Sequence, residues 1–371
     1  MKQGWEIKKL GEVCEILDHL RVPITKKDRR EGCYPYYGAS GVQDYIDSYI
    51  FDGRYLLVGE DGAKWGANDK SAYIIEGKSW VNNHAHILKI NDCLSDKLVE
   101  YYLVAKDLQE FITGAIVPKL TQQALRNIPI PVPPLPVQEQ IVSELDLLSG
   151  IIEKKREQLK ELDALAQSIF YDMFGDPITN EKGWEVKKLG EVCDKIGDGL
   201  HGTPTYDENG ETAFINGNNL IDGKILITDR TLFVNELEAQ RYRIDMNTNT
   251  ILLSINGTLG RTAIYRNENI ILGKSACYCN INDKFLTTKY VEYLMNSLQF
   301  KMFLEDNSSK STIKNVGLKI IRNYEIILPP LPLQHQFATK IEAIEKQKEL
   351  IKQSISETET LFNARMQEHF G

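Results

Sequence analysis

Polar residues of the kinds that contact nucleic acids are concentrated in short, glycine-containing stretches of two regions, 15–127 and 194–323. Asn, Ser, Thr and His side chains can hydrogen-bond to base edges, and Lys and Arg pair with phosphates. The candidates in the first region are Lys26, Lys27, Arg29, Arg30, Tyr37, Ser40, Glu60, Asp61, Lys64, Asn82, Asn83, His84 and Lys119. Those in the second region are His201, Thr203, Asn216, Asn218, Asn219, Ser254, Asn256, Thr258, Arg261, Lys310 and Lys314. Because Gly, Asn and Asp are also ordinary turn residues, no single stretch decides a function.

Motifs of known catalytic chemistry find no match in the sequence. The segments 77–79 and 273–275 both read Gly-Lys-Ser but lack the upstream glycine of a phosphate-binding loop. Neither Asn-Pro-Pro-Tyr nor Asp-Pro-Pro-Tyr, the motifs of amino-methyltransferases, is present. Asp61 with Glu76 and Lys78 faintly resembles the carboxylate–lysine set of a nuclease. The match carries little weight, because a chain with 52 acidic residues contains such groupings by chance.

Histidine and cysteine patterns give no metal site. His84 and His86 alternate as if on one face of a strand, but with no further ligand to identify, a structural histidine is the favoured interpretation. The six cysteines include no CxxC pair, which argues against a zinc ribbon or a thioredoxin site. Cys277 and Cys279 are predicted to be buried strand thiols. We expect reduced thiols and no bound metal.

Length and composition are those of an ordinary globular protein. A chain of 371 residues suggests two or three domains, and 42% apolar with 26% charged residues is typical of a soluble protein. No apolar run is long enough to span a bilayer, and the first residues lack a signal core, so we expect a cytoplasmic protein without a membrane partner. The net charge of −8 argues against a strongly basic nucleic-acid binder. The acid excess lies mainly in 128–182 and 324–371, so either polar region could still carry a basic face.

The chain is a tandem repeat. Residues 4–14 and 183–193 differ only at Ile7, which is Val186 in the second copy. A second matching pair, 127–140 and 323–336, contains the proline segments PVPPLP and LPPLP. The two copies are 1–175 and 176–371, and between the matching blocks they diverge. A constant frame with two different inserts is what a protein that reads two different targets would have.

A long helix is predicted after each proline segment, beginning near Val137 and Leu333. Apolar residues there recur at alternating spacings of four and three, the pattern of a coiled coil. Each helix would run for about 35 residues, and the two would pair with each other. Lys155, Lys348 and Thr358 interrupt the stripes, either to fix the register or because the phase shifts there. The Glu- and Lys-rich outer positions are a solvated face or a docking surface for another subunit.

The inserts are predicted to be mixed, either α+β or β-rich. In the first, strand-like runs at 34–38, 55–59 and 86–90 precede a helix over 95–112. In the second, strand-like runs at 213–216, 224–228, 250–255 and 261–266 precede a helix over 288–304.

The combination of these features resembles a known family over essentially the whole chain: the specificity subunit of type I restriction-modification systems. The resemblance is carried by the two W-E-[IV]-K-K-L-G-E-V segments, the two P-P-L-P-x-Q-x-Q helix entries and the insert motifs 36–41, 60–62 and 198–204. It implies an α+β fold of two tandem repeats, each a mixed α/β target-recognition domain followed by a long helix, with the helices paired as an antiparallel coiled-coil spacer. The segments would be recognition domains 1–134 and 176–330 and spacer helices 135–175 and 331–371.

The resemblance also implies a function and partners. Each recognition domain would read one half of an asymmetric bipartite site in double-stranded DNA, and the helices would set the gap. Two methyltransferase subunits would dock on this chain, and restriction/translocase subunits would join them. The chain itself would be non-catalytic and bind no cofactor, with S-adenosylmethionine, ATP and Mg on the partner subunits. Its near-neutral inserts imply modest DNA affinity without those partners.

Other interpretations remain open. Within the same class, the chain would serve a different multi-subunit modification system or be a silent copy. A second class is a non-DNA coiled-coil scaffold whose two inserts bind proteins or glycans. A third is an enzyme, a nuclease or hydrolase built on Asp61, Glu76 and Lys78.

Overall fold

The computed structural model describes residues 4–371, which form two compact units. Unit 1 is the chain up to Gln158 together with Leu350–Gly371, and unit 2 is Leu159–Glu349. Each unit contains one insert and parts of both long helices, so the units differ from the two sequence repeats and from the four predicted segments. Among the described residues, no helix combines the length and apolar character needed to cross a bilayer.

The two long helices begin at the last two residues of the proline segments. α4 spans Leu135–Phe174 and α9 spans Leu331–Phe370, 40 residues each, or roughly 60 Å of helix. They start slightly earlier than predicted, because Pro136 and Pro332 fall in the first turn, where a missing N–H costs no hydrogen bond. They are also longer than the predicted length.

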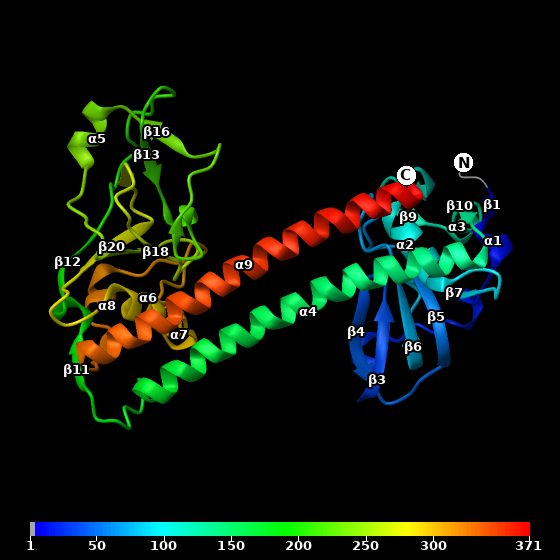
Figure 1. Ribbon diagram of the computed structural model, residues 1–371, viewed down its shortest axis with the longest axis horizontal. Coiled ribbons are helices and arrows are strands. Elements are labelled where there is room, and N and C mark those ends of the chain that lie inside the picture. The colour runs from blue at the N-terminus through cyan, green and yellow to red at the C-terminus, as the bar shows by residue number, and fades with distance from the viewer. Residues whose placement is uncertain (1–3) are drawn as a thin grey trace. The chain divides into compact units, whose positions relative to one another are not determined.

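Within each unit, α4 and α9 run antiparallel (Figure 1). The contacts that establish this are Glu144–Arg365 at 2.8 Å and Arg156–Glu359 at 2.7 Å in unit 1, and Asp163–Lys348 and Phe170–Phe337 in unit 2. Rising residue numbers on α4 meet falling numbers on α9, so the predicted antiparallel coiled coil is confirmed.

Every position of the apolar stripe predicted on each helix is buried or half-buried, and at the helix ends the stripe also packs against the inserts. Its polar interruptions pair across the helices. The Lys155 ammonium donates to Ser354 Oγ and, at 3.2 Å, to Thr358 Oγ1. Lys348 pairs with Asp163. The heptad phase therefore continues through these residues, and the alternative of a phase shift is excluded.

Unit 1 is built on a six-stranded mixed sheet in the order β2-β7-β5-β6-β3-β4. These strands are β2 (Cys14–Ile16), β3 (Glu31–Gly38), β4 (Gly41–Ile46), β5 (Phe51–Gly59), β6 (Ala72–Val81) and β7 (Ala85–Ile90). The two repeat blocks of this copy meet as strands, because β1 (Glu6–Lys9) pairs antiparallel with β10 (Pro129–Val132). The remaining elements are α1 (Leu10–Val13), α2 (Asp96–Ala105), β8 (Ile112–Thr113), β9 (Lys119–Leu120), α3 (Gln122–Arg126) and 3-10 turns at Asp18–Leu20, Lys26–Asp28 and Gln109–Phe111.

Unit 2 contains a four-stranded sheet, β12-β20-β17-β18, and a three-stranded sheet, β16-β13-β19. These strands are β12 (Cys193–Asp198), β13 (Thr212–Ile215), β16 (Leu232–Val234), β17 (Thr250–Ser254), β18 (Thr262–Ile264), β19 (Ile270–Leu272) and β20 (Ala276–Ile281). As in unit 1, the repeat blocks pair, here as β11 (Glu185–Lys188) and β21 (Glu325–Leu328). The other elements are 3-10 turns at Leu189–Glu191 and Gly217–Asn219, β14 (Leu220–Ile221), β15 (Lys224–Ile225), α5 (Glu236–Tyr242), α6 (Thr288–Asn296), α7 (Leu298–Asp306) and α8 (Leu318–Arg322). The mixed α/β class predicted for both inserts is confirmed.

Two helix predictions need correction. The helix expected over 95–112 ends at Ala105, because the chain turns so that Leu108 N–H donates to the carbonyl of Trp65 at 2.8 Å. The helix expected over 288–304 is two helices, α6 and α7. They are separated at Ser297, whose hydroxyl accepts a hydrogen bond from Phe300 N–H and caps α7.

The ends of the long helices complete the cores of the units. In unit 1, Ile141 and Leu145 of α4 and Met366 of α9 are buried in one cluster with residues of α2. In unit 2, the ring of Phe174 lies 5.1 Å from that of Phe337 and 4.9 Å from that of Tyr290. Each insert is thus packed onto a helix pair rather than attached by a flexible linker.

Candidate nucleic-acid interface

Predicted site residues of unit 1 come together where the loops after β5 and β6 meet. The loop 60–65 follows β5, and the turn 82–84 joins β6 to β7, a neighbour of β5. The ring Nδ1 of His84 contacts the carboxylate of Asp61, and Glu60 N–H donates to the carbonyl of His84 at 2.8 Å. Asn82 N–H donates to the carbonyl of Tyr37 at 3.0 Å, which adds β3 to the group. Sheet order therefore brings five of the predicted residues together.

A charged cluster adjoins this group and consists of Asp18, Arg21, Glu60, His86 and Lys119. We call it the buried charged cluster, because all of its side chains except that of Lys119, which is 42% exposed, are largely buried. Arg21 pairs with Glu60, and Lys119 Nζ lies 2.7 Å from the same carboxylate. The Nδ1 of His86 lies 2.6 Å from Asp18, and Nε2 lies 2.7 Å from a backbone carbonyl oxygen. Since a carbonyl oxygen can only accept, Nε2 must donate. The cluster ties the segment before β3 to β7, β9 and the loop after β5.

The pKa values of the two carboxylates reflect these partners. Burial would raise the pKa of Asp18, but the hydrogen bond and charge of His86 and the charge of Arg21 outweigh it, so the pKa is lowered. Burial likewise opposes ionisation of Glu60, and hydrogen bonds from Lys119 and Arg21 outweigh it, so that pKa is also lowered. Both groups are held as carboxylates.

Asp18, Glu60 and His86 offer ligand atoms that lie within 4.8 Å of one another. The same carboxylates already balance Arg21 and Lys119, so the cluster fits an internal ion-pair network better than a cation site. The prediction that His84 and His86 share one strand face is wrong. His84 is exposed in the turn before β7, whereas His86 is buried within the strand.

The basic cluster near the start of the first insert is divided between two roles. Lys26, Lys27 and Arg30 are exposed. Arg29 is half-buried, donates to Asp44 at 3.2 Å and lies over the ring of Tyr36 at 4.1 Å. The hydrogen bond from Arg29 lowers the pKa of Asp44. Three cations therefore remain available to a ligand, while the charge of Arg29 is compensated inside the unit.

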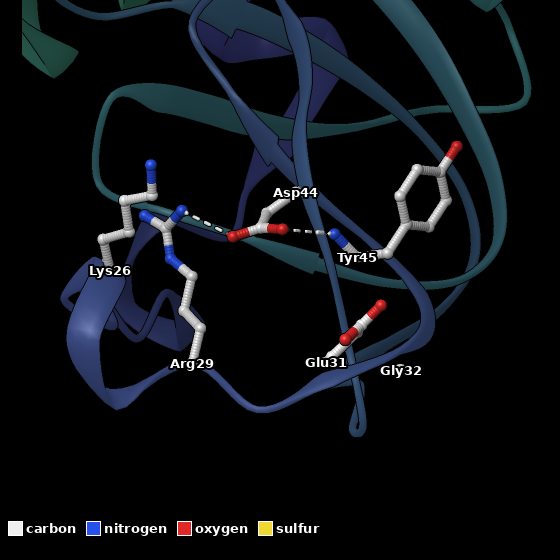
Figure 2. Close-up of a pocket in the computed structure, with 6 residues that line it drawn as sticks. All are labelled: Lys26, Arg29, Glu31, Gly32, Asp44 and Tyr45. Carbon is white, nitrogen blue, oxygen red and sulfur yellow. Dashed lines mark hydrogen bonds and ion pairs between the residues drawn. The ribbon is translucent and has the colours of Figure 1, made fainter.

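Figure 2 shows the open cavity beside this cluster, of about 470 Å³. Its lining residues are Lys26, Arg29, Glu31, Gly32, Asp44 and Tyr45. Charges of both signs face it, and the Arg29–Asp44 pair occupies its wall. Of the other predicted residues in unit 1, Ser40, Lys64 and Asn83 are exposed in loops.

In unit 2, His201 and Thr203 lie on the exposed loop after β12. The Nε2 of His201 lies 2.6 Å from the carboxylate of Asp198, and 71% of the histidine side chain is exposed. Together with His84 and Asp61, this gives each unit one exposed histidine–aspartate pair on a predicted contact loop.

Other predicted residues of unit 2 hold loops in place. Asn216 N–H donates to Asn219 Oδ1 at 3.0 Å, which closes a short turn. Ser254 is fully buried, and its hydroxyl accepts from Arg261 N–H at 2.8 Å. The prediction that Ser254 contacts DNA directly is therefore corrected, because no ligand can reach it in this conformation. The same correction applies to the buried side chains of Asn82 and Glu60 in unit 1.

The remaining candidates of unit 2 are accessible. Asn218, Thr258, Lys310 and Lys314 are exposed, and Asn256 and Arg261 are half-buried. Lys314 pairs with Glu305. The guanidinium of Arg261 donates to the carbonyl of Asn218 at 3.4 Å, so these two belong to one surface.

The residues of the proposed nuclease set have separate partners. Asp61 contacts His84, Glu76 pairs with Arg54 at 3.4 Å, and the Lys78 ammonium lies 4.7 Å from the ring of Tyr49. These contacts give no support to a shared catalytic group.

Comparison with known proteins gives one consistent family. The model of the type I restriction modification DNA specificity domain matches residues 2–163 and again 181–360. A putative type I restriction enzyme specificity subunit of Haemophilus influenzae is 28% identical over 350 residues, covering 92% of this chain and 87% of the relative. A type I restriction enzyme specificity subunit of Methanocaldococcus jannaschii is 26% identical over 384 residues, with the same coverages.

A solved structure shares the fold. The S subunit of a type I restriction-modification system from M. genitalium superposes with a TM-score of 0.63 at 13% identity, covering 99% of this chain and 96% of that one. Two matches to one family model, on two inserts framed by the same strands and helices, account for the tandem repeat. The chain belongs to the family of type I restriction modification DNA specificity domains.

Proposed function

We propose that this chain gives sequence specificity to a type I restriction-modification complex, with each insert reading one half of an asymmetric bipartite DNA site. The observation that carries the proposal is the pair of dissimilar polar loop sets on two equivalent frames. The first presents Asp61, His84 and the exposed lysines and arginine of 26–30, and the second presents His201, Asn218 and Thr258. Different side chains on the loops of two equivalent frames favour two different half-sites.

The helix pair is the proposed spacer and docking element. Two methyltransferase subunits would bind along α4 and α9, and restriction/translocase subunits would join that complex. S-adenosylmethionine, ATP and Mg would reside on those partners, and this chain would contribute no catalytic group. Because the chain carries a net charge of −8, we expect tight DNA binding only within the complex, since phosphate neutralisation dominates such affinity. Such a complex would act on DNA in the cytoplasm.

Methylation mapping tests this function. The chain would be co-expressed with the adenine methyltransferase subunit of its operon, and host DNA sequenced for N6-methyladenine. A bipartite motif with a fixed gap, absent without this chain, is the expected result. Replacing residues 15–127 by the insert of another specificity subunit should change one half of the motif only. A stable complex that methylates no site would indicate a silent copy, and failure to form a complex would revive the scaffold alternative, which the family match does not favour.

A further inference from the structure

Each insert ends in a short hairpin, and the two hairpins are equivalent. In unit 1, β8 and β9 enclose the turn 114–118, and in unit 2 the hairpin spans 309–315, where Ser309 N–H donates to the carbonyl of Asn315 at 2.9 Å. The returning strand of each hairpin bonds to the loop after the central strand, through a bridge between Asp61 and Lys119 in unit 1 and between Asn256 and Asn315 in unit 2. We call these two elements the tip hairpins.

An exposed aliphatic side chain lies at each tip hairpin. Ile116 is 95% exposed and Val117 62%, and Ile313 in unit 2 is 63% exposed. When the bridging residues Lys119 and Asn315 are aligned, Val117 and Ile313 occupy the same position. A single exposed aliphatic residue needs no explanation. Its recurrence at one position of two inserts that otherwise differ in sequence points to a shared use.

The surroundings of the tip hairpins are polar and include lysine side chains. In unit 1 the tip adjoins Lys119 and the loop of Asp61. In unit 2 it lies between Lys310 and Lys314, beside the loop of Asn256, and Gly257 N–H donates to the carbonyl of Lys314 at 2.9 Å. The neighbours named here are charged or polar residues, which suit a polar partner better than a hydrophobic one. A DNA duplex offers lysine-compatible phosphates together with apolar base surface.

We propose, on the basis of the function proposed above, that Ile116 with Val117 and, in the other unit, Ile313 pack against the apolar surface of a base in the respective half-site. DNA presents such surface as the methyl group of thymine in the major groove or as the face of a base at an opened step. The tip residues would then contribute to affinity and to base preference next to the polar contacts of the loops they adjoin.

The test uses the complex reconstituted with its methyltransferase subunits and a duplex carrying the mapped site. The variants are Ile116→Ser combined with Val117→Ser, and Ile313→Ser, with Ile178→Ser as matched control, because Ile178 is 73% exposed in the segment between α4 and β11. We expect each tip variant to weaken binding of the cognate duplex about tenfold, the order expected for an aliphatic side chain that loses its buried contact. The control should bind as the unsubstituted chain does, and all variants should retain its melting temperature.

Two further measurements distinguish the two kinds of base surface. Replacing single thymines by deoxyuridine removes the methyl group, so a methyl contact predicts weaker binding by the unsubstituted complex but no further loss in the tip variant. An opened step predicts a rise in 2-aminopurine fluorescence in that half-site, and the variant should abolish the rise.

The outcomes that would overturn the inference are separate from those that bear on the function. If the unsubstituted complex methylates a bipartite site and the tip variants bind it equally well, the tips do not contact bases. If the variants lose the methyltransferase subunits on co-purification, the tips dock protein and the inference is wrong. If the unsubstituted complex recognises no site, it is the proposed function that fails.

Discussion

The ammonium of Lys155 on α4 lies 3.2 Å from the hydroxyl of Thr358 on α9, so two residues that interrupt the apolar stripes of the helices bond to each other. Thr358 Oγ1 also donates to the carbonyl of Ser354, to which Lys155 is bonded as well. This polar layer fixes the register of the helix pair in unit 1, at the cost of apolar packing.

Replacing Lys155 by Leu should therefore stabilise the chain. The hydroxyl of Thr358 keeps its bond to Ser354, and an apolar stripe residue replaces a half-buried cation, so we expect the free energy of unfolding to rise by about 1 kcal/mol. Urea titration followed by circular dichroism measures the change. Lys160→Leu, on the exposed face of α4, is the control and should shift the midpoint little. A lower midpoint for Lys155→Leu would mean that the polar layer contributes more than the packing it displaces.

The buried charged cluster should make unit 1 sensitive to acid. Because the pKa values of Asp18 and Glu60 are lowered in the fold, their contribution is complete above the unfolded values of about 4 and is lost as the pH falls through the folded values. Glu60→Gln leaves Arg21 and Lys119 without a full counter-charge and should cost about 3 kcal/mol at neutral pH. The variant should also show a shallower loss of stability in acid.

Urea unfolding from pH 7 down to pH 3 measures both the loss of stability in the Glu60→Gln variant at neutral pH and the pH dependence of its stability. Glu110→Gln is the matched control, because Glu110 is 65% exposed and pairs with Lys106 on the surface. A change below about 0.5 kcal/mol is expected there. If the two substitutions lowered the free energy of unfolding equally, the cluster would stabilise unit 1 no more than a surface ion pair does.

Two exposed cations of the first insert should contribute to DNA affinity without reading sequence. Lys27→Ala with Arg30→Ala should weaken binding of the complex to all duplexes alike and reduce the slope of log K against log salt by about 2, one unit per phosphate contact. Filter binding over a range of salt concentrations measures the slope. Lys284 is an exposed cation outside the predicted contacts, so Lys284→Ala should leave the slope unchanged. If the double variant also had an unaltered slope, residues 26–30 would not contact DNA phosphates.

Arg29 should behave differently from its neighbours in the sequence. It donates to Asp44 and lies over the ring of Tyr36, so Arg29→Ala should lower the melting temperature of the chain. We expect a loss of about 1 kcal/mol from the removed hydrogen bond and cation–π contact. Differential scanning calorimetry checks this, with Arg30→Ala as the exposed control. If Arg29→Ala melts normally but loses DNA affinity, its internal role is secondary.

The repeat provides a matched pair of aromatic residues at the ends of the long helices. Phe174 is fully buried among aromatic rings in unit 2, and its counterpart Phe370 is half-buried, with its ring 5.7 Å from that of Tyr102. Phe174→Ala should destabilise its unit by about 4 kcal/mol, and Phe370→Ala should have a smaller effect on its own. Amide hydrogen exchange assigns each loss to a unit, and equal losses would contradict the difference in burial.

The helices, the repeat and the mixed inserts were predictable because their signals are local. The heptad spacing and the proline segments each lie within one stretch of chain, and the repeat is found by comparing two pairs of similar segments. The break at Ser297 also had a local signal, since a serine three residues before Phe300 is a helix N-cap.

The buried charged cluster could not be predicted in the same way. Asp18 and His86 are 68 positions apart, and Arg21 and Glu60 are 39 apart, so only the pairing of β2, β7 and β5 brings them together. For the same reason Glu60, Asn82 and Ser254 looked like exposed loop residues although their side chains are buried. Which residues are polar was readable from the sequence, but which of them face outward depended on the sheet.

The order in which the chain is synthesised is not the order in which its units can be completed. Unit 2 has all of its residues once Glu349 has been made, whereas unit 1 still lacks Leu350–Gly371. That last segment supplies Met366, which is buried with Ile141 and Leu145. Until that segment has been synthesised, Ile141 and Leu145 lack the packing partner that Met366 provides. The unit whose residues come first in this sequence is therefore completed after the other.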